Sequence, residues 1–236
     1  MGLSLAERGG AADLGPVGLQ VRRIIEERII THVLRPGERL SESELSSQLG
    51  VSRQPVREAL IRLTEAGLVR VLPQRGTVVT RISVTLVNSA RFVREAVERV
   101  VVRQAASQAT PEAIRQMRAI IRAQSDAIEA EDHATFLRLD DELHRSFAVA
   151  IGLEEVWRSL QPVKLHMDRV RYLSLPDATP GARLLEQHTG IVEAIAKGNA
   201  EAAEAIMHQH LSELLSSLPR LVAKLPDYFD GVDQTD

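Results

Sequence analysis

The sequence predicts a mainly α-helical protein in two parts: a small N-terminal domain with a β-hairpin, and a larger all-helical C-terminal bundle. The chain has 236 residues, more than one average domain, and only 3% of them are aromatic. Apolar residues recur at helical spacing along most of the chain, and strand-like stretches are confined to residues 68–82. We place the two domains at residues 16–82 and 83–222. A disordered tail (1–15) and an acidic tail (223–236) are expected to flank them.

Three short helices are predicted before the hairpin. A helical stripe of apolar residues from Val17 predicts the first. Ser41 and Glu44 have the spacing of a capping box, so a second helix is expected to begin there and to end at Gly50. Ser52 is expected to cap the third helix.

The hairpin follows the third helix. Residues 68–72 and 77–82 are β-rich, and the Pro and Gly of residues 73–76 are typical of the turn between them. Three helices and a hairpin make a winged helix-turn-helix, whose third helix can lie in the major groove of DNA. Polar residues of that helix lie away from its apolar stripe, where an arginine can bind guanine O6 and N7 together. Arg75 at the tip of the hairpin is placed to reach the minor groove or the backbone. The alternative is an ordinary solvated face.

The charge is distributed unevenly along the chain. The net charge is −3, but residues 1–82 carry about +3 and the remainder about −6. A basic N-terminal part and an acidic C-terminal part suggest that only the N-terminal part binds a polyanion.

Six helices are predicted in the C-terminal part, near residues 84–106, 111–130, 134–150, 154–174, 181–197 and 200–217. Asp140 and His144 are four residues apart, so their side chains share one helix face. His188 and His210 lie on two other helices, and a bundle can bring such residues together around one ion. An Asp/His₃ set suits Zn²⁺, Ni²⁺, Mn²⁺ or Fe²⁺. The alternative is a solvated acidic face with unrelated histidines.

Two long motifs then resemble a known family. The segments Leu34-x-Pro36-Gly37-x-x-Leu40-x-Glu42-x-x-Leu45 and Gly50-Val51-Ser52-Arg53-x-Pro55-Val56-Arg57-Glu58-Ala59-Leu60 resemble the DNA-binding domain of the GntR family. The resemblance implies DNA contacts at Ser52, Arg53, Gln54, Arg57, Arg75 and Gly76. Ser43 stands where many members carry an arginine, which removes one expected contact.

The C-terminal part resembles the FCD effector domain of the FadR-type subfamily, with six helices as in its VanR-like branch. The resemblance rests on Phe136-x-x-x-Asp140-x-x-Leu143-His144-Arg145 and on His188-x-x-Ile191-x-x-Ala194-Ile195-x-x-Gly198-Asn199, followed by His210-Leu211. It implies that a metal is bound by Asp140, His144, His188 and His210. It also places Arg94 beside the effector cavity, where it could bind a carboxylate. The alternative for Arg94 is an i,i+4 salt bridge with Glu98.

Together these features predict a homodimeric transcription regulator, a repressor, that reads an inverted-repeat DNA operator. A small carboxylate or sugar-acid effector is expected at a metal ion, Zn²⁺ being the most fitting. A regulator that senses the metal itself, or uses it only structurally, is the alternative, and a metalloenzyme is a remote one. We expect no enzyme activity, no membrane association and a cytoplasmic location, since the chain has no long apolar run.

Overall fold

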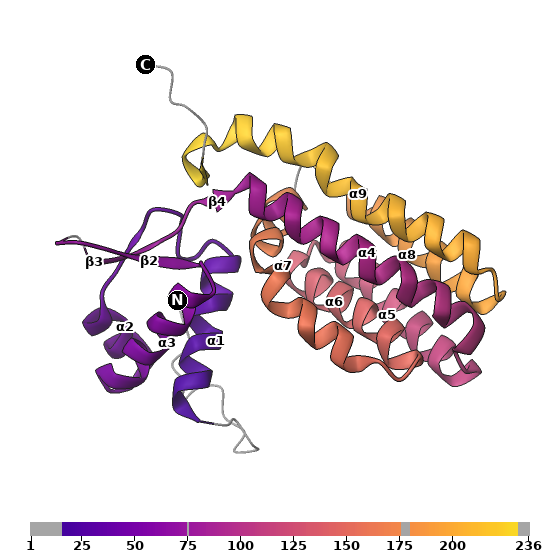
Figure 1. Cartoon of the computed structure of the whole chain (residues 1–236), viewed down its shortest axis with the longest axis horizontal. Coiled ribbons are helices and arrows are strands. Elements are labelled where there is room, and N and C mark those ends of the chain that lie inside the picture. Colours follow the sequence, from indigo (N-terminus) through magenta and orange to yellow (C-terminus); the bar gives the residue numbers. More distant parts are fainter. Residues whose placement is uncertain (1–15, 75, 176–179, 231–236) are drawn as a thin grey trace. The chain divides into compact units, whose positions relative to one another are not determined.

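The computed structural model describes residues 16–74, 76–175 and 180–230 and divides the chain into two compact units (Figure 1). The first unit comprises Met1–Ser83 and Asp227–Asp236, and the second comprises Val84–Pro226. The tail predicted over residues 1–15 lies outside the described residues. Within the described ranges, no helix is both long enough and apolar enough to span a membrane.

Over the described residues before Thr80, the first unit contains three helices and a small antiparallel sheet. Its elements are α1 (Val17–Ile30), β1 (Arg39–Leu40), α2 (Glu42–Leu49), α3 (Arg53–Glu65), β2 (Val69–Leu72) and β3 (Gly76–Val79). The strand order is β1-β3-β2, so the predicted hairpin is present and gains a short third strand that the sequence pattern did not indicate. This is the expected winged helix-turn-helix.

The ends of α2 have the capping contacts that the sequence predicts, whereas the start of α3 lacks a side-chain capping bond. The Ser41 side chain accepts a hydrogen bond from the Glu44 amide, and Gly50 ends α2 with a φ of 67°, which favours glycine. Ser52 stands at the N-cap of α3 but makes no side-chain capping bond. Ser52 therefore takes the predicted N-cap position, but its exposed side chain does not supply the expected capping bond.

The C-terminal segment departs from the predicted acidic tail. Helix α9 continues to Lys224, whereas the sequence pattern predicted its end near residue 217. A short helix, η1 (Pro226–Tyr228), and strand β5 (Phe229–Asp230) follow, and β5 pairs in parallel with β4 (Ile82–Ser83). Phe229 is only 1% exposed and anchors this segment, while Pro226, Asp227 and Asp230 are exposed.

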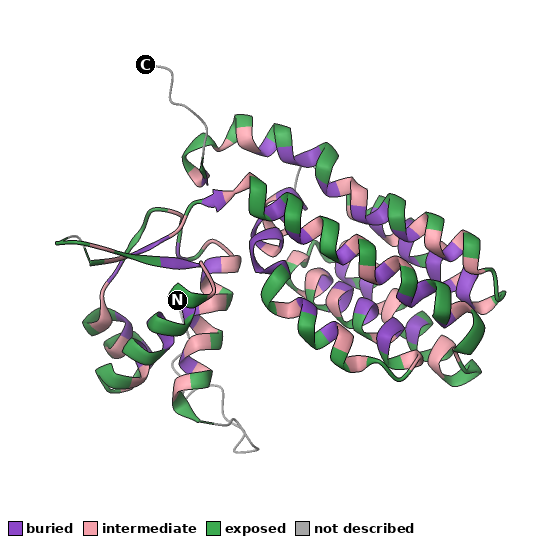
Figure 2. Cartoon of the chain, in the orientation of Figure 1, coloured by how far each residue is buried: buried purple, intermediate pink, exposed green. Residues whose placement is uncertain are grey.

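The second unit consists, over its described residues, of six helices: α4 (Val84–Gln108), α5 (Pro111–Glu129), α6 (His133–Ala150), α7 (Glu154–Ser174), α8 (Gly181–Ala196) and α9 (Ala200–Lys224). The predicted number is confirmed, because strong signals mark the boundaries. Thr110 and Asn199 cap α5 and α9 with their side chains. Figure 2 shows buried and exposed residues alternating around each helix, as one-sided packing requires.

The main core of this unit lies among all six helices, α4 to α9. Leu143 and Phe147 of α6 pack there with Trp157 of α7, Ile191 of α8 and Met207 of α9. All five side chains are at least 94% buried. The four candidate metal ligands come from three of these helices, so the packing of the core sets their spacing.

Candidate functional site

Four potential metal ligands meet inside the second unit. Asp140 and His144 lie one turn apart on α6, His188 lies on α8, and His210 lies on α9. One ligand atom from each lies within 4.8 Å of the others, and all four residues are at most 8% exposed. The structure thus brings together all four residues that the sequence singled out.

The separations between the ligand atoms suit a single ion. The Nε2 atoms of His144 and His210 are 3.1 Å apart, and His188 Nε2 lies 3.3 Å from Asp140 Oδ1. Two donors about 2.0–2.2 Å from one ion, at tetrahedral to octahedral angles, lie roughly 2.9–3.5 Å apart. Both separations fall in that interval.

Each histidine also makes a polar contact through Nδ1, its other ring nitrogen. His144 Nδ1 contacts the Glu98 carboxylate, His188 Nδ1 lies 2.9 Å from Gln124 Oε1, and His210 Nδ1 lies 3.2 Å from Gln187 Oε1. Such contacts fix the ring orientation of metal-binding histidines. The three Nε2 atoms are left facing one another.

The partners of His144 and His210 also indicate which ring nitrogen carries the proton when the imidazole is neutral. A carboxylate only accepts, so His144 Nδ1 must donate to Glu98. Gln187 Nε2 donates to Glu213 at 3.0 Å, which leaves Gln187 Oε1 to accept from His210 Nδ1. In the neutral form, with the proton on Nδ1, each of the two histidines presents only a lone pair at Nε2.

Lone pairs that face each other at 3.1 Å repel unless a cation lies between them. Two further atoms of the cluster, His188 Nε2 and Asp140 Oδ1, are buried and have no hydrogen-bond partner. Buried polar atoms normally have a partner, and an ion would supply one to both. The residues present therefore fit a divalent metal ion.

Asp140 is held in its ionised form by neighbouring charges. Burial by itself would raise its pKa, but the charge of the Arg171 guanidinium holds that pKa well below the usual 3.8. Arg171 donates to Asp140 Oδ2 and also to Asp141 and Asp168. Only Asp140 Oδ1 remains free, so Asp140 is set up as a ligand through one oxygen.

Burial favours the neutral form of His188 and His210, which is the form that binds metal. Burial lowers the pKa of His188 and lowers the pKa of His210 well below the usual 6.5. In both cases burial outweighs the opposing effect of the Asp140 carboxylate.

A cavity opens beside the cluster. Asp140 and His210 line it together with Arg94, Arg171 and Glu213, and its apolar wall is formed by Met167, Leu175, Leu184, Leu211 and Leu214. The cavity has a volume of about 40 Å³ and combines two guanidinium groups, two carboxylates and an apolar wall at one edge of the cluster.

The sequence left two roles open for Arg94, a salt bridge with Glu98 and a place beside the cavity, and in the structure Arg94 has both. Arg94 Nε donates to Glu98 at 2.5 Å, as an i,i+4 salt bridge. The pair is not a surface pair, because Arg94 is 1% exposed and also lines the cavity. The Arg94 guanidinium lies 6.0 Å from the ring centroid of Trp157, on which His144 stacks.

The supporting residues Gln124, Gln187, Glu98 and Arg171 were not identified from the sequence as parts of the site. Glu98 was considered only as the partner of Arg94. One signal could have found Gln187: it directly precedes His188, on the same side of α8 as the bundle interior. Gln124 and Arg171 carry no local signal, since their roles depend on how the helices pack.

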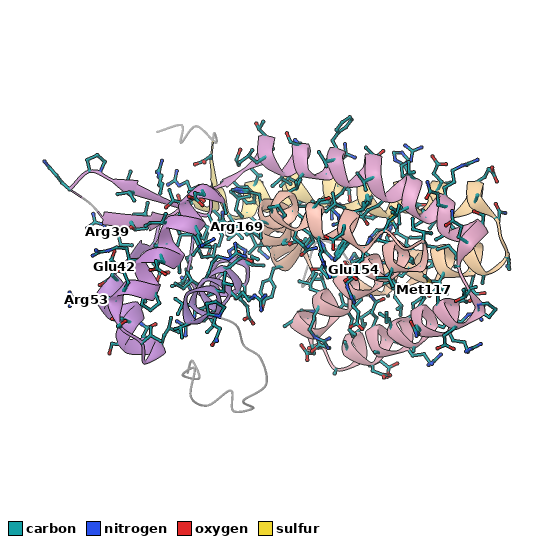
Figure 3. All side chains as sticks on the ribbon, turned by 60° about the horizontal axis from the view of Figure 1, so that its bottom comes forward. Arg39, Glu42, Arg53, Met117, Glu154 and Arg169 are labelled. Carbon is teal, nitrogen blue, oxygen red and sulfur yellow. The ribbon has the colours of Figure 1, made fainter. Side chains whose placement is uncertain are left out.

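The candidate DNA-binding residues that are described lie on the surface of the first unit. Ser52, Arg53, Gln54 and Arg57 are exposed on α3, while Val56, Ala59, Leu60 and Leu63 are buried on its opposite side. Figure 3 shows Arg53 projecting from the surface, with Arg39 and Glu42 on the same side.

Arg57 is held by a partner that the sequence did not indicate. Its Nε and one terminal nitrogen donate to the Glu42 carboxylate of α2, at 3.1 and 3.0 Å. The hydrogen bond from Arg57 lowers the pKa of Glu42. One terminal nitrogen of Arg57 is not engaged by Glu42, so Glu42 orients the guanidinium and leaves it able to donate to DNA.

The remaining candidates lie around the wing and the start of α2. Gly76 is exposed at the start of β3 with a φ of 77°, while Arg75 lies outside the described residues. The Ser43 hydroxyl bonds that of Ser41 at 2.8 Å, so Ser43 takes part in the cap of α2.

Comparisons with known proteins agree with both units. Residues 18–79 match the family described as bacterial regulatory proteins, gntR family, and residues 90–213 match the FCD domain. The chain is 38% identical over 214 residues to the HTH-type transcriptional repressor RspR of Escherichia coli, covering 91% of this chain and 94% of that protein. It is 28% identical over 193 residues to the Nta operon transcriptional regulator of Aminobacter aminovorans, covering 82% and 90%. The structure of McbR/YncC from E. coli superimposes with a TM-score of 0.76, at 19% identity over 88% of this chain and 99% of that one.

Proposed function

The chain belongs to the GntR family and carries an FCD domain, so it is a DNA-binding transcription regulator and not an enzyme, and we propose that it is a repressor controlled by a small organic acid at a metal site. The relative from E. coli is named as a repressor. In this proposal, α3 and the wing of the first unit read the operator, and the buried cluster of the second unit is the sensing site.

One observation carries the proposal: the lone pairs of buried histidines converge on a buried carboxylate oxygen beside a cavity lined by arginines. Asp140, His144, His188 and His210 would hold the ion, for which Zn²⁺ is the first choice and Ni²⁺, Mn²⁺ and Fe²⁺ also suit the donor set. The ion would supply open coordination positions for the oxygens of a carboxylate or sugar acid.

The residues of the chain define the class of effector. Arg94 and Arg171 place guanidinium groups on the cavity wall, beside the carboxylates of Asp140 and Glu213, and a guanidinium can bind the carboxylate of a ligand through two hydrogen bonds. The leucines of the opposite wall favour a ligand with some apolar surface. The effector alters operator affinity only as far as it prefers one state of the protein over the other.

We further propose that the active form is a homodimer. A two-fold pair of first units would present two copies of α3 to successive major grooves, which matches an inverted-repeat operator.

The test is a thermal-shift screen of the Zn²⁺-loaded protein against small carboxylic and sugar acids, with the His188→Ala variant as control. A ligand that binds only the folded protein raises its melting temperature. We expect at least one acid to stabilise the wild type and none to stabilise His188→Ala. An acid that stabilises both proteins equally would contradict binding at the cluster.

A structural ion, or direct sensing of the metal, is the second candidate, favoured by the complete burial of His188 and the 1% exposure of Asp140. It predicts that chelation melts the second unit and changes operator binding, while no acid in the screen has an effect.

A further inference from the structure

The segment that follows α9 returns to the linker between the two units. Phe229 and Asp230 pair with Ile82 and Ser83 as parallel strands, and Figure 1 shows the yellow ribbon that follows α9 ending beside β4. Ile82 is fully buried and Phe229 is 1% exposed. The ring of Tyr228 lies 5.5 Å from that of His32, within the first unit. The linker strand therefore has a specific binding partner: the chain's own C-terminal segment.

The two strands continue directly into α4 and α9. Helix α4 begins at Val84, one residue after β4, and α9 ends at Lys224, just before η1. The helices run antiparallel, as their contacts show: Arg103 with Glu201, Arg99 with Glu204, and Glu95 with His208. Pairing of β4 with β5 thus ties the first residue of α4 to the last residue of α9.

The same two helices hold the metal cluster. His210 is a residue of α9, and Glu98 of α4 fixes the ring of His144. Pro219 lies between His210 and the end of α9, where it removes one backbone hydrogen bond of the helix and weakens it locally. A shift of α9 relative to α4 at the cluster would act on both paired strands: on β4 through α4, and on β5 through α9.

We propose that residues 226–230 form a tether, which holds the linker strand Ile82–Ser83 and transmits the state of the cluster to the DNA-binding unit. The mode of binding is addition of a strand to an exposed strand edge, with Phe229 as the buried anchor. The transmitting role rests on the proposed function, whereas the binding of the tether to the linker does not.

The first arm of the test uses metal-free protein and measures amide hydrogen exchange over residues 80–86. Phe229→Ala removes the anchor, and truncation after Leu225 removes the whole tether. Truncation after Asp230 is the matched control, because it shortens the chain but keeps the tether. We expect exchange at least tenfold faster in the first two variants and unchanged in the control. Equal exchange in all four proteins would overturn the proposal. The fluorescence of Trp157, the only tryptophan, checks that the second unit stays folded.

The second arm measures operator affinity with Zn²⁺ and with chelator. In the wild type the ratio of the two affinities should differ from one by about 5-fold or more, and in Phe229→Ala it should approach one while Zn²⁺ still binds. A ratio that Phe229→Ala leaves unchanged would overturn the transmitting role. A ratio of one in the wild type itself would contradict metal control of operator binding, which belongs to the proposed function, while the exchange rates still decide whether the tether forms.

Discussion

Replacement of Glu98 by glutamine tests whether the buried ion pair of Arg94 and Glu98 is formed beside the metal cluster. The Glu98 carboxylate accepts from Arg94 at 2.5 Å and also contacts His144 Nδ1. Arg94 is 1% exposed and the Glu98 side chain 5%. The shape of the side chain is kept in Glu98→Gln, and the amide oxygen can still accept one hydrogen bond. The negative charge that neutralises a buried guanidinium is lost.

The magnitude follows from this burial. Removing one partner of a buried ion pair leaves the other charge uncompensated, which costs about 3–5 kcal/mol. With a urea m-value of about 2 kcal/mol/M, the unfolding midpoint should fall by roughly 1.5–2.5 M. Metal affinity should also fall, by about 10- to 100-fold, because the residue that orients His144 is altered.

The assay is urea unfolding of metal-free protein followed by Trp157 fluorescence. Trp157 is the only tryptophan and its ring centroid lies 6.1 Å from that of His144, so the signal reports on the second unit. Glu155→Gln is the matched control, since that glutamate is 80% exposed and should leave the midpoint unchanged. The double variant Arg94→Met/Glu98→Met should recover most of the lost stability. If Glu98→Gln leaves the midpoint where it is in the wild type, the buried ion pair is not formed as described and the reasoning fails.

Three further predictions concern the DNA-binding face, the metal and pH. Arg57→Ala should weaken operator binding about 10- to 100-fold in a fluorescence anisotropy titration, without changing the unfolding midpoint, and unchanged affinity would show that α3 does not read the operator. Removal of Zn²⁺ with a chelator should lower the stability of the second unit by about 2.7 kcal/mol relative to protein held at 100 times the dissociation constant, and equal midpoints with and without Zn²⁺ would contradict a bound ion. Burial lowers the pKa of His188 and His210 in the folded protein, so the unfolded chain takes up protons first as the pH falls. The stability of metal-free protein should therefore be full above about pH 6.5 and decrease below it by up to about 1.4 kcal/mol per pH unit for each histidine, as urea midpoints between pH 5 and 8 would show.

Helices were predictable where their signals are local. Thr110 and Asn199 cap helices with their own side chains, and one-sided apolar stripes set the faces of α3 and of the bundle. The metal ligands were also accessible, because Asp140 and His144 share a face by spacing alone, and the family resemblance supplied His188 and His210.

Features that depend on long-range packing were not accessible. The pairing of Phe229 with Ile82 joins residues far apart in the sequence, in strands too short to show an alternating pattern. The contact of Arg57 with Glu42 requires the exact approach of α3 to α2, which no local pattern encodes. Ser52 has the right residue type for a cap, yet its side chain makes no capping bond, since residue preference does not fix the side-chain conformation.

The most direct test of the central claim is the metal content of the purified protein after equilibrium dialysis against Zn²⁺, compared with that of the His210→Ala variant. Four converging ligands with two unpartnered atoms predict one ion per chain in the wild type and a loss of most of that ion in His210→Ala. His133→Ala, which changes a histidine outside the cluster, should bind as the wild type does. Equal metal content in wild type and His210→Ala, or none in either, would contradict a metal centre at these residues.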